Sequence, residues 1–260
     1  GSVKQIAMDG AAAVQAARTP PGQIATLIVP ADVAWGEGSI PAAPLAAAPR
    51  PQVAPEVLRT VSQVLLSGEP TMLFLNGQAL SEAGLFASHR ISHATGAKLL
   101  GPTHVPRMAR GRGRVPVDRI PYGVDAALQV LAGLKHLILV GAKPPVGFFA
   151  YPGKPSLMAP EDCVIHVFAH PEQDAVAALQ WLADEINAPR LVPIKEEGPK
   201  PCIAQGPFHS KAFGMTLSAL LPENAIVCDD TVTSGRAIFP AMFNAAPHDW
   251  IQSTGGAIGH

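Results

Sequence analysis

Short apolar runs alternate with amphipathic segments through the middle of the chain, between residues 56 and 188. The runs have the length and aliphatic composition of buried strands, and they fall at residues 72–75, 97–99, 136–140 and 164–168. Apolar residues recur at helical spacing in residues 56–67, 124–131 and 173–186. Because parallel strands must be joined by crossovers, this alternation predicts an α/β fold with a parallel sheet and helices on both faces.

A separate helix and strand pattern precedes this region. Residues 11–17 are helical in composition, a Pro-Pro-Gly triplet then breaks the helix, and residues 23–29 form a β-rich apolar run that ends in PADV. Residues 39–55 are rich in Ala and Pro with almost no charge, which is typical of an extended linker. The start of the chain therefore has the pattern of the last helix and strand of another α/β domain.

A third pattern begins after residue 206. The apolar run Ile226–Cys228 ends in two acidic residues and a stretch rich in hydroxyls, DDTVTSG, and residues 250–253 lead into the glycine-rich turn GGAIG. Hydroxyls and free backbone N–H groups beyond the carboxyl end of a strand make a site for a phosphate-bearing molecule. The alternative is an ordinary strand, turn and helix with a capping Asp or Thr.

Both ends of the chain resemble the thiamine-diphosphate-dependent enzymes of the acetolactate synthase, benzoylformate decarboxylase and pyruvate decarboxylase superfamily. The segment PPGQIATLIVPADV is similar to the end of that family's pyrimidine-binding domain, and residues 229–234 and 255–259 are similar to the opening of its diphosphate-binding domain. The resemblance implies five parts: residues 1–38 end the pyrimidine domain, 39–55 are a linker, 56–188 form a central Rossmann-like domain, 189–206 are a second linker and 207–260 begin the diphosphate domain.

The resemblance also implies a cofactor site. Four residues would lie beside the diphosphate of thiamine diphosphate: Asp230, Thr231, Thr233 and Ser234. The carbonyl of Gly256 would accept a hydrogen bond from the 4′-amino group, and Ile258 would bend the cofactor into its V shape. The family's Mg²⁺-binding stretch and its activating glutamate are not found in the 260 residues, so no metal ligand or catalytic residue is assigned. We expect the chain as given to be an inactive part of a parent 2-oxo-acid decarboxylase or carboligase.

Two loops of the central region bear on other ligands. Flavin-dependent members of the family carry Gly-x-Arg after the strand that corresponds to residues 136–140, and here GAKPP lacks the arginine, so we expect no FAD. The aromatic residues of 146–155 are expected to plug a loop or contact a subunit. The arginine-rich residues 107–119 are expected to be a solvated, mobile loop, with binding of nucleotide or acyl-CoA phosphates as the alternative.

Composition excludes several classes of function. A formal net charge of −1 and a pI near 6.8 give no general attraction for nucleic acid or for an anionic membrane. The sequence has neither an apolar run of membrane-spanning length nor a leader at its start, which predicts a cytoplasmic protein. The three cysteines lack zinc or disulfide spacing, and His89 and His93, four residues apart, have no acidic ligand at the spacing that a metal site needs.

The resemblance finally implies assembly as a homodimer or homotetramer. The apolar side chains of residues 239–243 are expected to lack a covering fold in this chain, so that the segment after residue 200 is disordered or pairs with another copy. The alternative to an enzyme is a non-enzymatic Rossmann-like module that binds an adenine nucleotide, or nothing, at the loops after Leu75 and Val140.

Overall fold

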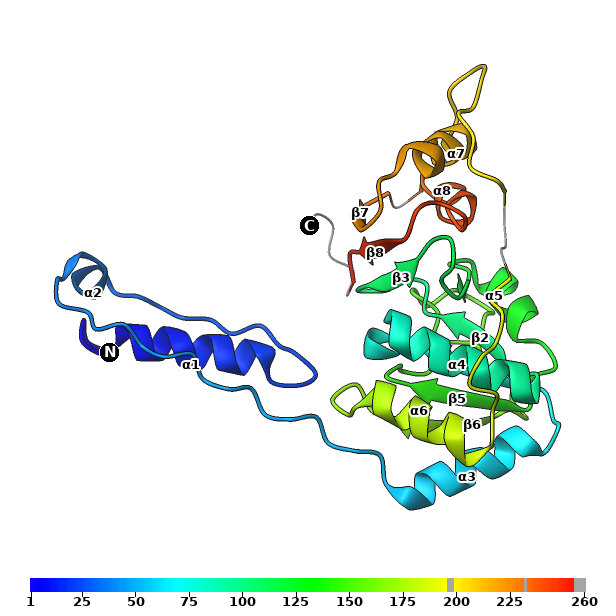
Figure 1. The fold of residues 1–260 in the computed structure, drawn as a ribbon, viewed down its shortest axis with the longest axis horizontal. Helices are drawn as coiled ribbons and strands as arrows, with labels where there is room; N and C mark the ends of the chain where they lie inside the picture. Colours follow the sequence, from blue (N-terminus) through cyan, green and yellow to red (C-terminus); the bar gives the residue numbers. More distant parts are fainter. Residues whose placement is uncertain (196–198, 232, 255–260) are drawn as a thin grey trace.

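The computed structural model describes residues 1–195, 199–231 and 233–254. Its N-terminal arm stands apart from the rest of the molecule (Figure 1) and contains helix α1 (Ile6–Arg18), as residues 11–17 predicted, and the short helix α2 (Ala31–Trp35). An extended segment then leads to helix α3, so the linker expected at residues 39–55 has no helix or strand before Pro55. Among the described residues, no helix is long and apolar enough to span a membrane.

The strand predicted over residues 23–29 is wrong. These residues are all described and form no strand, and Ile24 and Ile28 are 95% and 83% exposed. A strand is stable only when a neighbouring strand satisfies its backbone groups and covers its apolar side chains. The arm offers no such neighbour, so the run remains extended and unpaired.

A parallel sheet of five strands forms the centre of the molecule, as predicted. Its strands are β1 (Thr71–Leu75), β2 (Lys98–Gly101), β4 (Asp118–Arg119), β5 (His136–Val140) and β6 (Val164–Ala169), in the order β4-β2-β1-β5-β6. Every neighbouring pair is parallel. The α/β fold class and its Rossmann-like central sheet are therefore confirmed.

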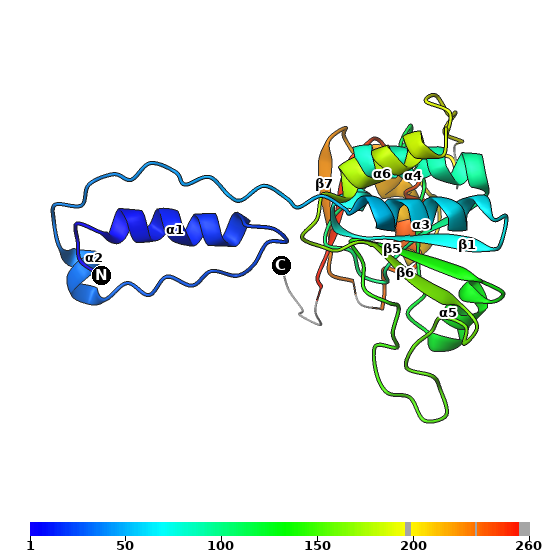
Figure 2. The ribbon, with the colours of Figure 1, turned by 90° about the horizontal axis from the view of Figure 1, so that it is seen from below.

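Helices cover both faces of this sheet. Helices α3 (Pro55–Leu66), α4 (Glu82–Thr95) and α6 (Ala175–Glu185) lie on one face and α5 (Val124–Leu131) on the other (Figure 2), with the short 3₁₀ turn η1 (Gly77–Leu80) after β1. Alternate residues of a strand point to opposite faces. Ile138 accordingly packs in the core beneath α3, α4 and α6, whereas Leu137 packs beneath α5. Both are fully buried.

A smaller three-stranded sheet joins the C-terminal segment to the central domain. Strand β8 (His248–Gln252) pairs in parallel with β7 (Ala225–Asp229) and antiparallel with β3 (Met108–Arg110). Helix α7 (Ser210–Leu220) and the one-turn helix α8 (Ile238–Ala241) pack against each other. Strand β3 comes from the arginine-rich segment, so residues on both sides of the predicted boundary at 188 form one sheet.

The arginine-rich segment is not the solvated loop that was expected. Arg110 is only 3% exposed, and its guanidinium lies 3.3 Å from the ring centroid of Phe239. Arg107 pairs with Asp249 at 2.5 Å, and Arg114 donates to the carbonyl of His248 at 2.6 Å. These arginines therefore bind β8 and the aromatic residues beside it. The local charge pattern alone does not predict these contacts.

The expectation that residues 239–243 lack a cover is also wrong. Phe239 and Met242 are 4% and 0% exposed, and they belong to the same apolar core as the buried face of the central sheet. The ring of Trp250 meets Phe239 edge-on, with centroids 5.2 Å apart. Burial of these side chains within one chain shows that the C-terminal segment does not need a second copy to cover them.

Candidate functional site

The carboxyl end of β7 is held against β8 by one carboxylate. Asp229 lies opposite Gln252 in the parallel register. Its Oδ1 accepts the backbone N–H of Thr231 at 3.0 Å and also the Thr231 hydroxyl, while its Oδ2 accepts the Gln252 side-chain amide at 2.9 Å. The acidic residue that ends the strand thus shapes the turn that follows.

Four of the six predicted cofactor residues lie together on this turn. Asp230 Oδ1 accepts the Ser253 hydroxyl at 3.1 Å, and Thr231, Thr233 and Ser234 are exposed. The other two, Gly256 and Ile258, lie outside the described residues. The structure therefore places a row of exposed hydroxyls beyond the end of β7, where the sequence predicted them.

Gly235 closes the turn tightly. It is buried, and a Cβ built on it would lie 1.6 Å from Thr231 Oγ1 and 2.6 Å from Thr231 Cβ. No side chain fits there unless the backbone of the turn moves. The neighbouring Arg236 is exposed, and its guanidinium lies 5.9 Å from the ring centroid of Tyr122.

A hydrogen-bond chain that the sequence did not reveal connects this turn with the central sheet. Gln252 Oε1 accepts from Arg119 Nη1, and the same Nη1 donates to the carbonyl of Thr103 at 3.1 Å. Burial lowers the pKa of Arg119 to about 10, although Asp229 and Asp118 oppose the shift, so Arg119 keeps its charge at pH 7. Arg119 was predicted to belong to a mobile loop, but here the pairing of β4 with β2 and these hydrogen bonds fix it.

A cavity of about 520 Å³ opens at the carboxyl ends of β1 and β5. The chain leaves β1 for β2 on one side and returns to β5 on the other, and ligands of open α/β sheets bind at such a switch point. Arg50 and Lys143 line the cavity, and none of its described lining residues is acidic. Phe148 and His104 line it as well, with their rings 5.9 Å apart. The aromatic loop expected as a plug or subunit contact thus supplies part of the wall, although Phe148 stays 47% exposed.

The floor of the cavity offers unused hydrogen-bonding capacity. Asn76 Oδ1 is buried without a hydrogen-bond partner, and a buried polar atom of this kind commonly meets a water or a ligand. Burial, followed by the charge of Arg119, lowers the pKa of His104, while Asp229 opposes the shift. His104 is therefore mostly neutral at pH 7, so Arg50 and Lys143 supply the cationic character.

Gly141 determines how closely the loops after β1 and β5 approach each other. Its φ is +64°, and a Cβ there would lie 2.8 Å from the backbone oxygen of Asn76. We expect Gly141→Ala to lower the free energy of unfolding by more than the ~1–2 kcal/mol that the left-handed conformation costs alone. Gly153→Ala is the matched control, because its φ is +70° and nothing lies within 4 Å of its Cβ. Equal urea midpoints for the two variants would show that the contact with Asn76 is not tight.

Comparison with known proteins adds a relative that spans nearly the whole chain. A protein of Mycobacterium tuberculosis named "Putative acetolactate synthase large subunit IlvX" is 43% identical over 255 residues, which is 98% of this chain and 48% of that protein. No family model matches the sequence.

Solved structures of two thiamine-diphosphate-dependent proteins share the fold. One, a "putative thiamin diphosphate-dependent enzyme" from Mycobacterium smegmatis, superposes with a TM-score of 0.71 at 20% identity, over 100% of this chain and 53% of its own. The other, a thiamine diphosphate-dependent 4-hydroxybenzoylformate decarboxylase from Rhodococcus jostii RHA1, gives a TM-score of 0.70 at 13% identity, over 96% of this chain and 51% of its own.

The chain is related along nearly its whole length to an acetolactate synthase large subunit-like protein and shares its fold with thiamine-diphosphate-dependent proteins, which is the resemblance that the motifs at its two ends predicted. It spans about half the length of the relatives that it matches. In the described part of the chain, no group of three or more His, Cys, Asp or Glu side chains could hold a metal ion.

Proposed function

We propose that the chain is the middle part of a thiamine-diphosphate-dependent subunit that acts on a 2-oxo acid, either as a decarboxylase or as a carboligase. The observation that carries this proposal is the turn after β7, with exposed hydroxyls and an obligatory glycine, in a chain related throughout to an acetolactate synthase-like protein. The chain would supply the end of the pyrimidine domain (1–38), the central domain (56–188) and the start of the diphosphate domain (207–260).

The turn fits one wall of a diphosphate site. Thr233 and Ser234 offer hydroxyl donors and Arg236 offers a cation, while Thr231, whose hydroxyl donates to Asp229, shapes the turn beside them; all four are exposed. Phosphate oxygens accept such donors at the carboxyl ends of strands. When bound, thiamine diphosphate would supply the electron sink for the reaction, and Mg²⁺ would offset the negative charge of its phosphates. Asp230 would lie beside this group, and Gly256 and Ile258 would face its pyrimidine ring.

Assembly and location follow from the same proposal. The parent subunit would act in the cytoplasm. It would assemble as a homodimer or homotetramer, because the cofactor of this superfamily lies between the pyrimidine domain of one subunit and the diphosphate domain of another. The two binding walls in this chain would then belong to different cofactor sites.

A second candidate function rests on the cavity between the loops after β1 and β5. Its two cations suit phosphate, its aromatic side chains suit a planar base, and Asn76 has a free acceptor. The chain would then serve as a Rossmann-like module that binds an adenine nucleotide or an acyl-CoA. FAD is not proposed, because Lys143 stands where the flavin-dependent members place an arginine.

Thermal unfolding of the purified chain with ADP, CoA, FAD or thiamine diphosphate with Mg²⁺ tests both candidates. Saturation at a hundredfold excess over Kd stabilises by about 2.7 kcal/mol, which shifts the midpoint by roughly 5–10 °C for a chain of this size. We expect a shift with ADP or CoA and none with FAD or thiamine diphosphate. The nucleotide candidate fails if ADP and CoA both leave the midpoint unchanged. A shift with micromolar thiamine diphosphate would contradict the claim that this chain forms only one wall of the site.

A further inference from the structure

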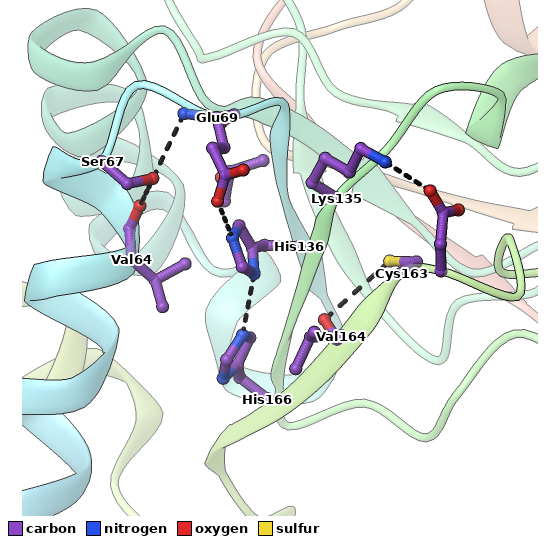
Figure 3. Close-up of polar contacts among 10 residues, drawn as sticks. Val64, Ser67, Glu69, Lys135, His136, Cys163, Val164 and His166 are labelled. Carbon is purple, nitrogen blue, oxygen red and sulfur yellow. Dashed lines mark hydrogen bonds and ion pairs between the residues drawn. The ribbon is translucent and has the colours of Figure 1, made fainter.

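Two histidines face each other at the edge of the central sheet opposite the cavity. His136 is the first residue of β5, and His166 lies on the neighbouring strand β6, opposite Ile138. Ile138 and Phe168, two residues after His136 and His166, are buried in the core beneath α3. Because every second residue of a strand points to the same face, the two histidine rings also lie on that face, near the end of α3. Figure 3 shows the two rings in line with the carboxylate of Glu69.

The contacts among these three side chains define which nitrogen atoms are available. His136 Nε2 lies 2.8 Å from Glu69 Oε2, and His136 Nδ1 lies 3.1 Å from His166 Nε2. A carboxylate only accepts hydrogen bonds, so His136 Nε2 carries the proton and, in the neutral ring, Nδ1 presents a lone pair to His166. His166 Nε2–H can donate a hydrogen bond to that lone pair.

The same separation suits a shared metal ion. Two imidazole nitrogens bound at ~2.0–2.1 Å to one tetrahedral ion lie about 3.3 Å apart, close to the spacing found here. The contact from Glu69 to the outer nitrogen of His136 is also the arrangement that orients metal-binding histidines and makes them more basic. Geometry and tautomer therefore both match a ligand pair with a supporting carboxylate.

We propose that His136 Nδ1 and His166 Nε2 form a site for a divalent transition metal of the Zn²⁺ class, oriented by Glu69. No third protein ligand accompanies them among the residues that the structure describes, so water would complete the coordination. The nearby cation Lys135 is paired with Asp162 and so does not compete for Glu69.

Calorimetric titration of the tag-free chain with ZnCl₂ at pH 7.5 tests this site. The background carries Cys202→Ser and Cys228→Ser, because both thiols are exposed and cysteine sulfur is a Zn²⁺ ligand. We expect one saturable site that His166→Gln abolishes and that Glu69→Gln weakens by at least about tenfold, since loss of a supporting partner costs 10–100-fold in affinity. His93→Gln is the matched control, because His89 and His93 lie four residues apart on α4, away from the proposed site, and we expect it to change nothing.

Three results would overturn the proposal. Absence of saturable binding at millimolar Zn²⁺ would mean that the two rings form a hydrogen bond only. Equal binding by His166→Gln and the parent chain would place the metal elsewhere, and loss of binding in His93→Gln would place it on α4. Nitrogen NMR of the histidine rings in the unsubstituted chain gives the same answer if a variant does not fold: only the His136 and His166 signals should shift with Zn²⁺. None of these outcomes depends on the proposed enzymatic function.

Discussion

Replacement of Arg110 by Ala is expected to lower the free energy of unfolding of the C-terminal sheet by about 2–4 kcal/mol, as for other large buried side chains. The guanidinium of Arg110 lies within 5.2 Å of the ring centroids of Phe239, Phe243 and Trp250. Its Nη2 donates to the carbonyl of Phe239 at 2.9 Å. Truncation would leave a cavity at the junction of the two sheets and remove cation–π contacts worth about 2 kcal/mol when desolvated.

Arg110→Met is the control that separates packing from charge. Arg110 Nε and Nη1 are buried without partners, and burial, with Arg119 as a further cause, holds the pKa of the group well below its usual value. A buried charge that is poorly satisfied contributes little net stability, so a long apolar side chain should cost no more than about 1 kcal/mol. Urea unfolding followed by the fluorescence of the neighbouring Trp250 measures both variants. If Met is as damaging as Ala, charge rather than packing holds the junction.

Gly235→Ala is expected to lower turnover about a hundredfold in a complete subunit that carries this sequence, the effect of a small misplacement in an active site. The new Cβ would overlap Thr231 Oγ1 at 1.6 Å, and the close Thr231 Cβ prevents relief by side-chain rotation alone. The turn must therefore open, which separates the Thr231 hydroxyl from Asp229 and displaces the row of hydroxyls.

The affinity for thiamine diphosphate should fall together with turnover, because opening the turn displaces the row of hydroxyls that would face the diphosphate. Gly123→Ala is the matched control, since nothing lies within 4 Å of the Cβ added there. Wild-type cofactor affinity in Gly235→Ala would remove the turn after β7 from the diphosphate site.

The central sheet was predictable because its signals are local. The strand 136–140 and the helix 124–131 were found with the bounds that the structure has, since a run of four aliphatic residues after His136 and an amphipathic period each specify their element. The strand expected at 23–29 failed for the opposite reason. Its sequence favours a strand, but strand formation depends on a partner that these residues do not meet.

The candidate site was only partly predictable. The hydroxyl-rich turn after β7 was found from its position beyond an apolar run. Gln252 and Arg119, which connect the turn to the central sheet, were missed because the contact joins residues 133 positions apart. The burial of Arg110 was missed because a run of arginines carries the pattern of a solvated loop, and only the pairing of β3 with β8 removes it from water.

Release of CO₂ from a panel of 2-oxo acids by a complete subunit that carries this sequence tests the proposed function most directly. The subunit is stripped of cofactor and assayed with and without thiamine diphosphate and Mg²⁺, on pyruvate, 2-oxobutanoate and benzoylformate. We expect release from at least one acid that appears only when both are added and that Gly235→Ala lowers about a hundredfold. Binding of thiamine diphosphate without release from any of the acids, or release that does not require it, would contradict the assignment of this chain to a 2-oxo-acid decarboxylase or carboligase.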